Sequence, residues 1–326
     1  MNGVVRQDRP VSDRPLITFL VVAYRQEQFI REALAGALAQ TYAPLEIILS
    51  DDCSPDRTFE IIQEMAAAYH GSHTLVLNRN DRNLGLGSHI NRLMELARGE
   101  YIVVAAGDDI SLPERTEQIC GEFTASGRKA MAVFSDLTEM DGAGKDSGIL
   151  NAQPRYNLGD LEQMCERMFE GVAGASNAWQ RKVFDCFGPM LPEIVFEDRV
   201  IAFRAALLGE IRHIARPLVK YRRHPNNAVA MFQSADPKQT RRTLQCFLSV
   251  YRNNARDLET FVQKIQPDFK LASRCRRNIR RRIRKLESYL QIFSDHPRHR
   301  AWGLVRLAVN GGNLLQGMKL CMRKMR

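Results

Sequence analysis

The sequence of 326 residues lacks a long apolar run, an apolar signal segment and any regular cysteine spacing. Its longest apolar stretch, residues 16–23, is interrupted by Thr18 and falls far short of the ~20 residues that span a bilayer. Residues 1–14 are polar, so we expect them to be disordered and not to direct export. Seven scattered cysteines, an odd number, argue against a disulfide framework or a zinc site. These absences predict a protein of a reducing compartment, the cytoplasm.

Glycine-rich phosphate loops are also missing. Neither G-x-G-x-x-G nor G-x-x-x-x-G-K-[ST] occurs, which excludes the common dinucleotide-binding and P-loop motifs. A nucleotide diphosphate bound here would need another group to neutralise its phosphates. A divalent cation, Mn²⁺ or Mg²⁺, held by carboxylate oxygen would meet that need.

Positive charge is concentrated in the last part of the chain. Residues 238–326 hold 22 Lys and Arg against 5 Asp and Glu, whereas the rest of the chain is net negative. This asymmetry favours an anionic partner, and the alternative is a solvated helical face. Trp302, Val305 and Val309 give the segment 302–309 an apolar face flanked by basic residues. That pattern favours a helix on an anionic membrane surface, or else packing against the body of the protein. Nucleic acid is not expected, because aromatic residues are sparse in the basic stretch.

Apolar residues recur with strand and helix periods in turn. The predicted strands cover residues 16–23, 45–49, 74–77, 101–105, 130–134 and 211–221, and the predicted helices cover 26–40, 56–69, 87–97, 114–124, 161–169 and 200–208. Strand and helix alternating in this way predict an α/β fold with a mostly parallel, doubly wound sheet. We expect a loop over 141–159. The predicted domains are 15–235 and a C-terminal basic α-helical region, 236–326.

Two carboxylates follow the fourth predicted strand. Asp108 and Asp109 come after the apolar run 101–105 and Gly107, and a loop then leads to Pro113. Ligands of open α/β sheets bind in the crevice beyond the carboxyl ends of the strands. Asp108 is therefore a candidate ligand for Mg²⁺ or Mn²⁺. The alternative is that the pair caps the helix after Pro113.

The first two predicted strands end in polar residues as well. Ala23, Tyr24 and Arg25 follow the first strand, and Asp51 and Asp52 follow the second. Adjacent parallel strands share one crevice, where this backbone and a carboxylate could bind a base and its ribose. The alternative reading makes the two aspartates turn residues.

Three segments resemble the inverting glycosyltransferases of family 2, which have the GT-A fold. They are SDDCSPDRT, NRNDRNLGLGSHINRLMELARGEYIVVAAGDD and FEDRVIAFRAALLGEIRHIARPLVKYRRHPNNAV, and the resemblance covers about residues 15–232. Within that family, the chain resembles the enzymes of bacterial cell-surface polysaccharide and lipopolysaccharide synthesis. The family's metal motif is usually Asp-x-Asp, and here Ala106 stands in place of the first Asp.

The resemblance implies roles for residues along the whole first domain. It implies that the nucleotide sugar is bound by Ala23, Tyr24, Arg25, Asp51, Asp52, Asn83, Gly85, Asn91 and Asp109. Asp108 and His224 are implied as metal ligands, and Arg222 or Arg223 could add donors to phosphate. Asp198, preceded by Glu197, is implied as the base that removes the acceptor proton. As an alternative, these two acids complement a helix dipole.

The acceptor pocket is implied to lie near Ser176, Asn177 and Trp179. Trp179 could stack on a sugar ring or be a core residue.

We therefore expect a metal-assisted, inverting hexosyl- or deoxyhexosyltransferase. Its donor would be a nucleotide-diphosphate sugar and its acceptor a hydroxyl of a lipid-linked or polysaccharide substrate. It would be peripheral on the inner face of the cytoplasmic membrane. The alternative is a non-catalytic nucleotide-sugar-binding module of a membrane polysaccharide assembly complex. A nucleotidyltransferase is disfavoured, because the loop after the first strand, AYRQEQF, has no glycine-rich basic character.

Overall fold

A computed structural model describes residues 14–150, 160–166, 174–225, 236–293, 298 and 302–306. The described residues form two compact units. The first unit contains 14–150 and 174–223, and the second contains the remainder. The segment 160–166 thus groups with the C-terminal helices and not with the 15–235 domain expected from the sequence. Residues 1–13 of the predicted disordered N-terminus lie outside the described residues.

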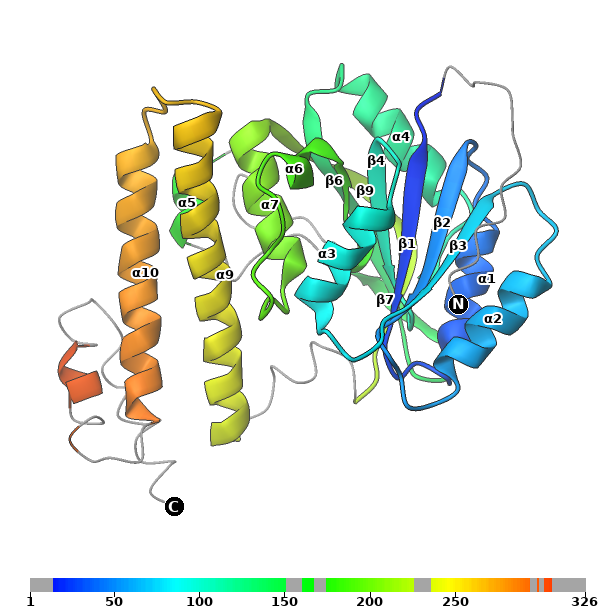
Figure 1. The fold of residues 1–326 in the computed structure, drawn as a ribbon, viewed down its shortest axis with the longest axis horizontal. Helices are drawn as coiled ribbons and strands as arrows, with labels where there is room; N and C mark the ends of the chain where they lie inside the picture. Colours follow the sequence, from blue (N-terminus) through cyan, green and yellow to red (C-terminus); the bar gives the residue numbers. More distant parts are fainter. Residues whose placement is uncertain are drawn as a thin grey trace. The chain divides into compact units, whose positions relative to one another are not determined.

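In the described chain, one nine-stranded sheet forms the centre of the first unit (Figure 1). Its strand order is β3-β2-β1-β4-β8-β6-β9-β5, and β7 pairs with β6. The strands are β1 (Ile17–Ala23), β2 (Leu45–Asp51), β3 (Thr74–Arg79), β4 (Tyr101–Ala106), β5 (Ile110–Ser111), β6 (Ala130–Met140), β7 (Asp146–Leu150), β8 (Ala178–Gln180) and β9 (Glu210–Arg222). Strands β1 to β4 are parallel, as are β6 and β9. The predicted α/β fold with a mostly parallel sheet is confirmed.

Helices follow the strands of the first unit. They are α1 (Ile30–Leu38), α2 (Thr58–Ala67), α3 (Leu86–Leu96), α4 (Arg115–Ala125), α6 (Lys182–Asp185) and α7 (Glu197–Leu208), with a 3₁₀ turn, η1 (Gly174–Ser176). Alternate residues of β1 point to the same side of the sheet. Phe19 and Val21 share one apolar core with residues of α1, α2 and α4. Helix α3 contacts β1 as well. The near-continuous apolar runs of β1 and β2 are buried along almost their whole length.

Four strands differ from the sequence prediction. β6 extends to Met140 because its polar second half pairs with β9 and then with β7. β7 falls in the predicted loop 141–159, of which 151–159 lies outside the described residues. β5 and β8 have two and three residues, too few to show a period-two pattern.

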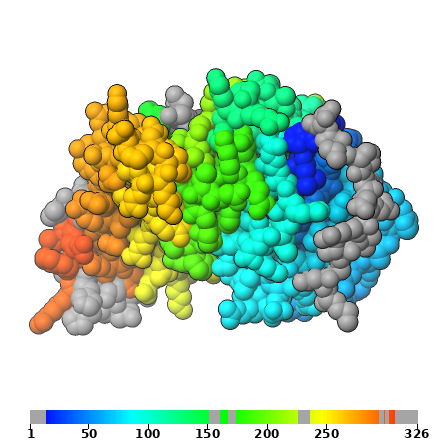
Figure 2. Space-filling view, turned by 45° about the horizontal axis from the view of Figure 1, so that its top comes forward, coloured from blue at the N-terminus to red at the C-terminus, as the bar shows by residue number. Residues whose placement is uncertain are grey.

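The second unit is helical. It contains α5 (Leu161–Glu166), α9 (Pro237–Lys264), α10 (Ala272–Ile292) and a short helix over 302–306. Helices α9 and α10 lie side by side, and α5 packs on α10 (Figures 1 and 2). Asp236 begins α9 by accepting a hydrogen bond from the N–H of Gln239. The predicted basic helical region is confirmed. Among the described helices, none combines the length and the apolar character needed to cross a membrane.

Candidate functional site

The carboxyl ends of β2, β1 and β4 lie next to one another. Ala23 is paired with Asp51, and Val22 is paired with Ala106. Beyond the strands, the N–H of Asp52 donates to the carbonyl of Ala23, and the N–H of Gly107 donates to the carbonyl of Val22, at 2.9 and 3.0 Å. The residues that were predicted to line a crevice therefore follow strand ends that lie at the same edge of the sheet.

Gly107 allows this close approach. A Cβ at this position would lie 3.0 Å from the Cβ of Ala23 and 3.1 Å from the side chain of Ile30. A larger residue here would require these neighbouring side chains to shift. Asp108 and Asp109 are thus held close to the end of β1.

Asp51 shapes the turn after β2. Its carboxylate is fully buried and accepts hydrogen bonds from both the N–H and the hydroxyl of Ser54. Ser54 in turn accepts a hydrogen bond from the N–H of Arg25, at 2.8 Å. The turn role considered for Asp51 is therefore realised. The same contact fixes the backbone at the end of β1, where Arg25 has a positive φ of 57°.

Asp52 holds the loop before α3. Its carboxylate accepts hydrogen bonds from the N–H groups of Leu84 and Gly85 and from the side chain of Asn80, at 2.8–2.9 Å. Gly85 has a φ of 78°, which favours glycine. The side-chain oxygen of Asn83 also accepts from the N–H of Gly85. This loop, predicted to contact the donor, is therefore built around one buried carboxylate.

Asn91 links α3 to the segment before α7. Its side-chain amide donates to the carbonyl of Met190, and its oxygen accepts from the N–H of Met190, at 2.9 and 2.8 Å. The N–H of Gly87 donates to the carbonyl of Ile194, at 2.9 Å. Asn91 was predicted to bind the donor. In the structure its amide is occupied by the backbone of the segment that leads to Glu197.

Sequence reasoning missed a buried polar cluster below the donor loop. His89 lies 2.5 Å from the hydroxyl of Ser50, which also accepts from the side chain of Asn78. Burial lowers the pKa of His89 to about 4, against the opposing effect of Asp52. His89 is therefore neutral at physiological pH and supports the loop. No motif in the sequence distinguishes it from other histidines.

Asp109 connects the end of β4 to β9. Its carboxylate is buried and accepts a hydrogen bond from the N–H of Arg222, at 2.9 Å. The helix-cap alternative is not realised for Asp109, because α4 is preceded by Glu114, without a side-chain cap. Burial, and then the charge of Asp108, raise its pKa well above the ordinary value.

Arg222 and Arg223, which were considered as phosphate donors, both contact groups of the protein. The buried guanidinium of Arg222 donates to the carbonyl oxygens of Asp108 and Gly142 and forms an ion pair with Glu32. Arg223 pairs with Glu139. A basic side chain at the end of a strand can equally serve the fold, and here both do.

Two residues, Asp108 and His224, were predicted from the sequence to be metal ligands. Asp108 lies near the end of β4 and is largely buried, and His224 directly follows Arg223 as a residue of the second unit. Across the described residues, no group of three or more His, Cys, Asp or Glu side chains is arranged to hold a metal ion. Mg²⁺ and Mn²⁺ are often held by one or two protein ligands together with substrate phosphates. The oxygen donor of Asp108 fits such a site.

Glu197 and Asp198 begin α7, as the sequence indicated. Asp198 accepts a hydrogen bond from the N–H of Arg199 and lies against Gly174 of η1, where an added Cβ would be 3.3 Å away. Burial raises the pKa of Asp198, while Arg199 lowers it. Burial, and then the charge of Asp198, raise the pKa of Glu197 to about 8. At neutral pH, Glu197 is therefore mostly protonated.

The segment after η1 contains a buried amide without a partner. Ser176 exchanges two hydrogen bonds with the backbone of Ser135, at 2.8 and 3.1 Å. Asn177 is only 2% exposed, yet neither its side-chain oxygen nor its nitrogen has a hydrogen-bond partner among the described residues. Trp179 is 1% exposed on β8, which favours the core reading over sugar stacking.

Two exposed residues at the end of β1 border this edge of the sheet. Tyr24 is 37% exposed, and the guanidinium of Arg25 lies over its ring at 5.3 Å from the centroid. An aromatic ring and a cation at the surface are suited to stacking on a base.

Comparisons with known proteins agree with this architecture. The family model described as Glycosyl transferase family 2 matches residues 18–187. EpsH of Bacillus subtilis (strain 168), which carries a glycosyltransferase name, is 28% identical over 257 residues, or 76% of this chain and 70% of EpsH. TarS 1–349 of S. aureus, solved in complex with UDP-GlcNAc, has a TM-score of 0.59 at 13% identity, covering 93% of this chain and 91% of that one. The mannosyltransferase PcManGT of Pyrobaculum calidifontis, solved with GDP-Man and Mn²⁺, has a TM-score of 0.53 at 15% identity, covering 95% and 87%. The chain therefore belongs to glycosyl transferase family 2 and has the GT-A fold.

Proposed function

We propose that this glycosyltransferase inverts the anomeric centre as it transfers a hexosyl or deoxyhexosyl group. The donor is a nucleotide-diphosphate sugar, and the acceptor is a hydroxyl of a lipid-linked or polysaccharide substrate. The observation that carries the proposal is the position of η1. This turn contacts both α7, which begins with Glu197 and Asp198, and β4, which leads to Asp108.

Asp198 acts as the general base in this proposal. It takes the proton from the acceptor hydroxyl as that oxygen attacks the anomeric carbon, on the face opposite the departing diphosphate. Its raised pKa makes its carboxylate a stronger base than an exposed aspartate would be. Glu197 beside it has a pKa of about 8 and so adds little negative charge at neutral pH.

The donor nucleotide is bound by the ends of β1 and β2 and by the loop before α3. Tyr24 and Arg25 offer a surface for the base, and backbone groups at Ala23 offer hydrogen bonds. Asp51 and Asp52 hold these segments through the contacts described above. Asn83 and Gly85 hold the loop in place, and Asn91 holds the helix that follows it.

A divalent cation, when bound, would stabilise the negative charge that develops on the departing diphosphate. Asp108 would hold it. Asp109, tied to the N–H of Arg222, keeps the chain after β4 in place beside the ligand. Ala106 stands where relatives carry a further carboxylate, so this chain relies on fewer protein ligands.

Asn177 is the main acceptor-binding residue of the proposal. A buried amide without partners costs about 1–3 kcal/mol for each unsatisfied group. Such a group in a native protein calls for a partner, and a sugar hydroxyl both donates and accepts hydrogen bonds. Ser176 holds the backbone next to Asn177 through its hydrogen bonds with Ser135, and Trp179 is a buried core residue.

The second unit is proposed to bring the protein to the inner face of the cytoplasmic membrane. In the short helix 302–306, Leu304 packs against Tyr289 and Ile292, whereas Trp302 and Val305 are 59% and 52% exposed. Exposed aromatic and aliphatic residues on a basic region favour an anionic membrane surface. Val309 lies outside the described residues.

A non-catalytic nucleotide-sugar-binding module is the second candidate, favoured only by Ala106. Both candidates require donor binding, and only the first requires transfer. The test is therefore a thermal-unfolding screen of the full chain with several nucleotide sugars and Mn²⁺, followed by a transfer assay. A donor at 100 times its Kd should stabilise the fold by about 2.7 kcal/mol. Stabilisation without transfer or donor hydrolysis would support the second candidate, and no stabilisation by any donor would reject both.

A further inference from the structure

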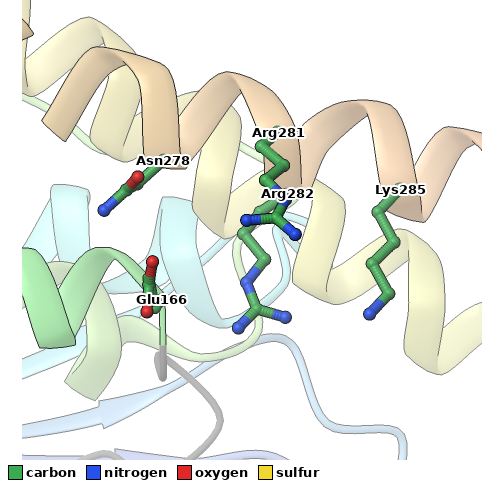
Figure 3. A pocket seen from close by; sticks show the side chains of 5 residues that line it. All are labelled: Glu166, Asn278, Arg281, Arg282 and Lys285. Atoms are coloured by element: carbon green, nitrogen blue, oxygen red, sulfur yellow. The ribbon is translucent and has the colours of Figure 1, made fainter. Parts of the chain in front are cut away.

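A cationic pocket lies in the second unit, which does not contain the strand ends that carry the proposed transfer. It has a volume of about 240 Å³ and is lined by Glu166 of α5 and by Asn278, Arg281, Arg282 and Lys285 of α10 (Figure 3). The four α10 residues follow helical spacing, so they lie on one face of that helix. The pocket is thus built by a regular element of the fold.

Among the residues that line this pocket, three cations face a single carboxylate, Glu166. No ion pair joins Arg281, Arg282 or Lys285 to a carboxylate of the residues that the structure describes. By contrast, Arg274 and Arg276 of the same helix pair with Glu162 and Glu259, at 3.0 and 2.7 Å. The cations of the pocket therefore differ from Arg274 and Arg276 of the same helix in having no such carboxylate partner among the described residues.

Repulsion within the pocket is visible at Lys285. Burial lowers its pKa, and the charges of Arg282 and Arg281 lower it further. Three cations facing one lining carboxylate leave two positive charges. A phosphate group carries about one to two negative charges at neutral pH and would match this excess.

The size of the pocket limits the ligand. Sites for drug-sized molecules usually have volumes of about 300–1,000 Å³, so this pocket suits a group smaller than a whole nucleotide. Two guanidinium groups offer the paired donors that phosphate oxygens accept, and the amide of Asn278 can add another. We propose that the pocket formed by α5 and α10 binds a phosphate group, presented by a soluble diphosphate or by a lipid headgroup.

The test compares two double variants of the full chain that remove equal charge from α10. Arg281→Gln/Arg282→Gln empties the pocket of guanidinium groups, whereas Arg274→Gln/Arg276→Gln removes two arginines that are already paired. Diphosphate is titrated by calorimetry without any sugar donor. We expect the first variant to weaken diphosphate binding by about tenfold or more, and the second to change it by less than about twofold. Lys285→Gln, a single change, provides the same test if the double variant folds poorly.

A second arm separates the two sources of phosphate. Sedimentation with vesicles of phosphatidylglycerol and phosphatidylcholine is compared with vesicles of phosphatidylcholine alone, with and without diphosphate. Binding to the anionic vesicles that is lost in Arg281→Gln/Arg282→Gln and competed by diphosphate identifies a headgroup. Diphosphate binding without a vesicle preference identifies a soluble ligand. The proposal is overturned if neither probe binds, or if both double variants lose binding equally, because general charge and not the pocket would then be responsible.

Discussion

The carboxylate of Asp52 accepts a hydrogen bond from the N–H of Gly85, 33 residues later in the chain, at 2.9 Å. This bond joins the end of a central strand to the loop that leads into α3. The loop has two further bonds to the same carboxylate, so Asp52 contributes much to its conformation. Donor binding should therefore depend on a residue whose side chain faces the protein itself.

Replacing Asp52 tests this relationship. Asp52→Ala leaves the loop N–H groups without their acceptor, and we expect a loss of about 1–3 kcal/mol in the free energy of unfolding together with weaker donor binding. Asp81→Asn, at an exposed position of the same loop, should change stability by less than about 0.5 kcal/mol. Chemical denaturation and donor titration measure both effects. Unchanged donor affinity in Asp52→Ala would show that the loop is held in another way.

Asn177 should show opposite effects on stability and on activity. Asn177→Leu removes an unsatisfied buried amide, so we expect the protein to keep or gain stability while the KM for the acceptor rises about tenfold or more. Ser176→Ala is the matched control, since it loses two hydrogen bonds and should be destabilised by about 1–2 kcal/mol. An Asn177→Leu protein with normal acceptor KM would remove this residue from the acceptor pocket.

The stability of the protein should fall as the pH rises through the titration of Glu197. Its pKa is about 8 in the folded protein against an ordinary value of 4.5, so the folded state binds this proton more tightly than the unfolded state. Stability is therefore lost between about pH 4.5 and 8 and stays lower above that range.

Glu197→Gln should remove this loss, so that the variant gains stability relative to the wild type above pH 8. Below pH 4.5 the titration of Glu197 should cause little difference in stability between the two proteins. Thermal unfolding across the pH range measures the difference. A constant difference between the two proteins at every pH would contradict the assigned titration.

Metal dependence should be traceable to Asp108. We expect a chelator to abolish transfer and Mn²⁺ or Mg²⁺ to restore it in the wild type. Asp108→Asn should lower kcat/KM by about 10²-fold or more and require higher metal concentrations. Transfer that is indifferent to chelation would exclude the cation from the mechanism.

The sequence contained most of the information about the sheet and less about the site. The strands β1 and β2 are long apolar runs, so their burial and order could be predicted, and the acids after β2 and β4 mark the crevice. The partners of these acids could not be predicted, because Asp52 meets Gly85 and Asp109 meets Arg222 only through the tertiary fold.

Arg222, the last residue of β9, and Arg223 show the same limit. Their charge favours phosphate binding in a sequence, but their actual contacts are Glu32 and Glu139. In a similar way, residues 161–166 were recognised as helical while their packing against α10 was not. That contact rests on side chains more than a hundred residues apart, such as Glu162 and Arg274.

The central claim concerns Asp198 as the base of an inverting transfer. Its most direct measurement is donor binding and sugar transfer by Asp198→Asn, which keeps the shape of the side chain and removes its basicity. We expect transfer by the variant to fall by about 10²–10⁴-fold, while its donor affinity and thermal stability stay near those of the wild type. The product of the wild type should have the inverted anomeric configuration. Transfer by Asp198→Asn at close to the wild-type rate, or a product of retained configuration, would contradict the account.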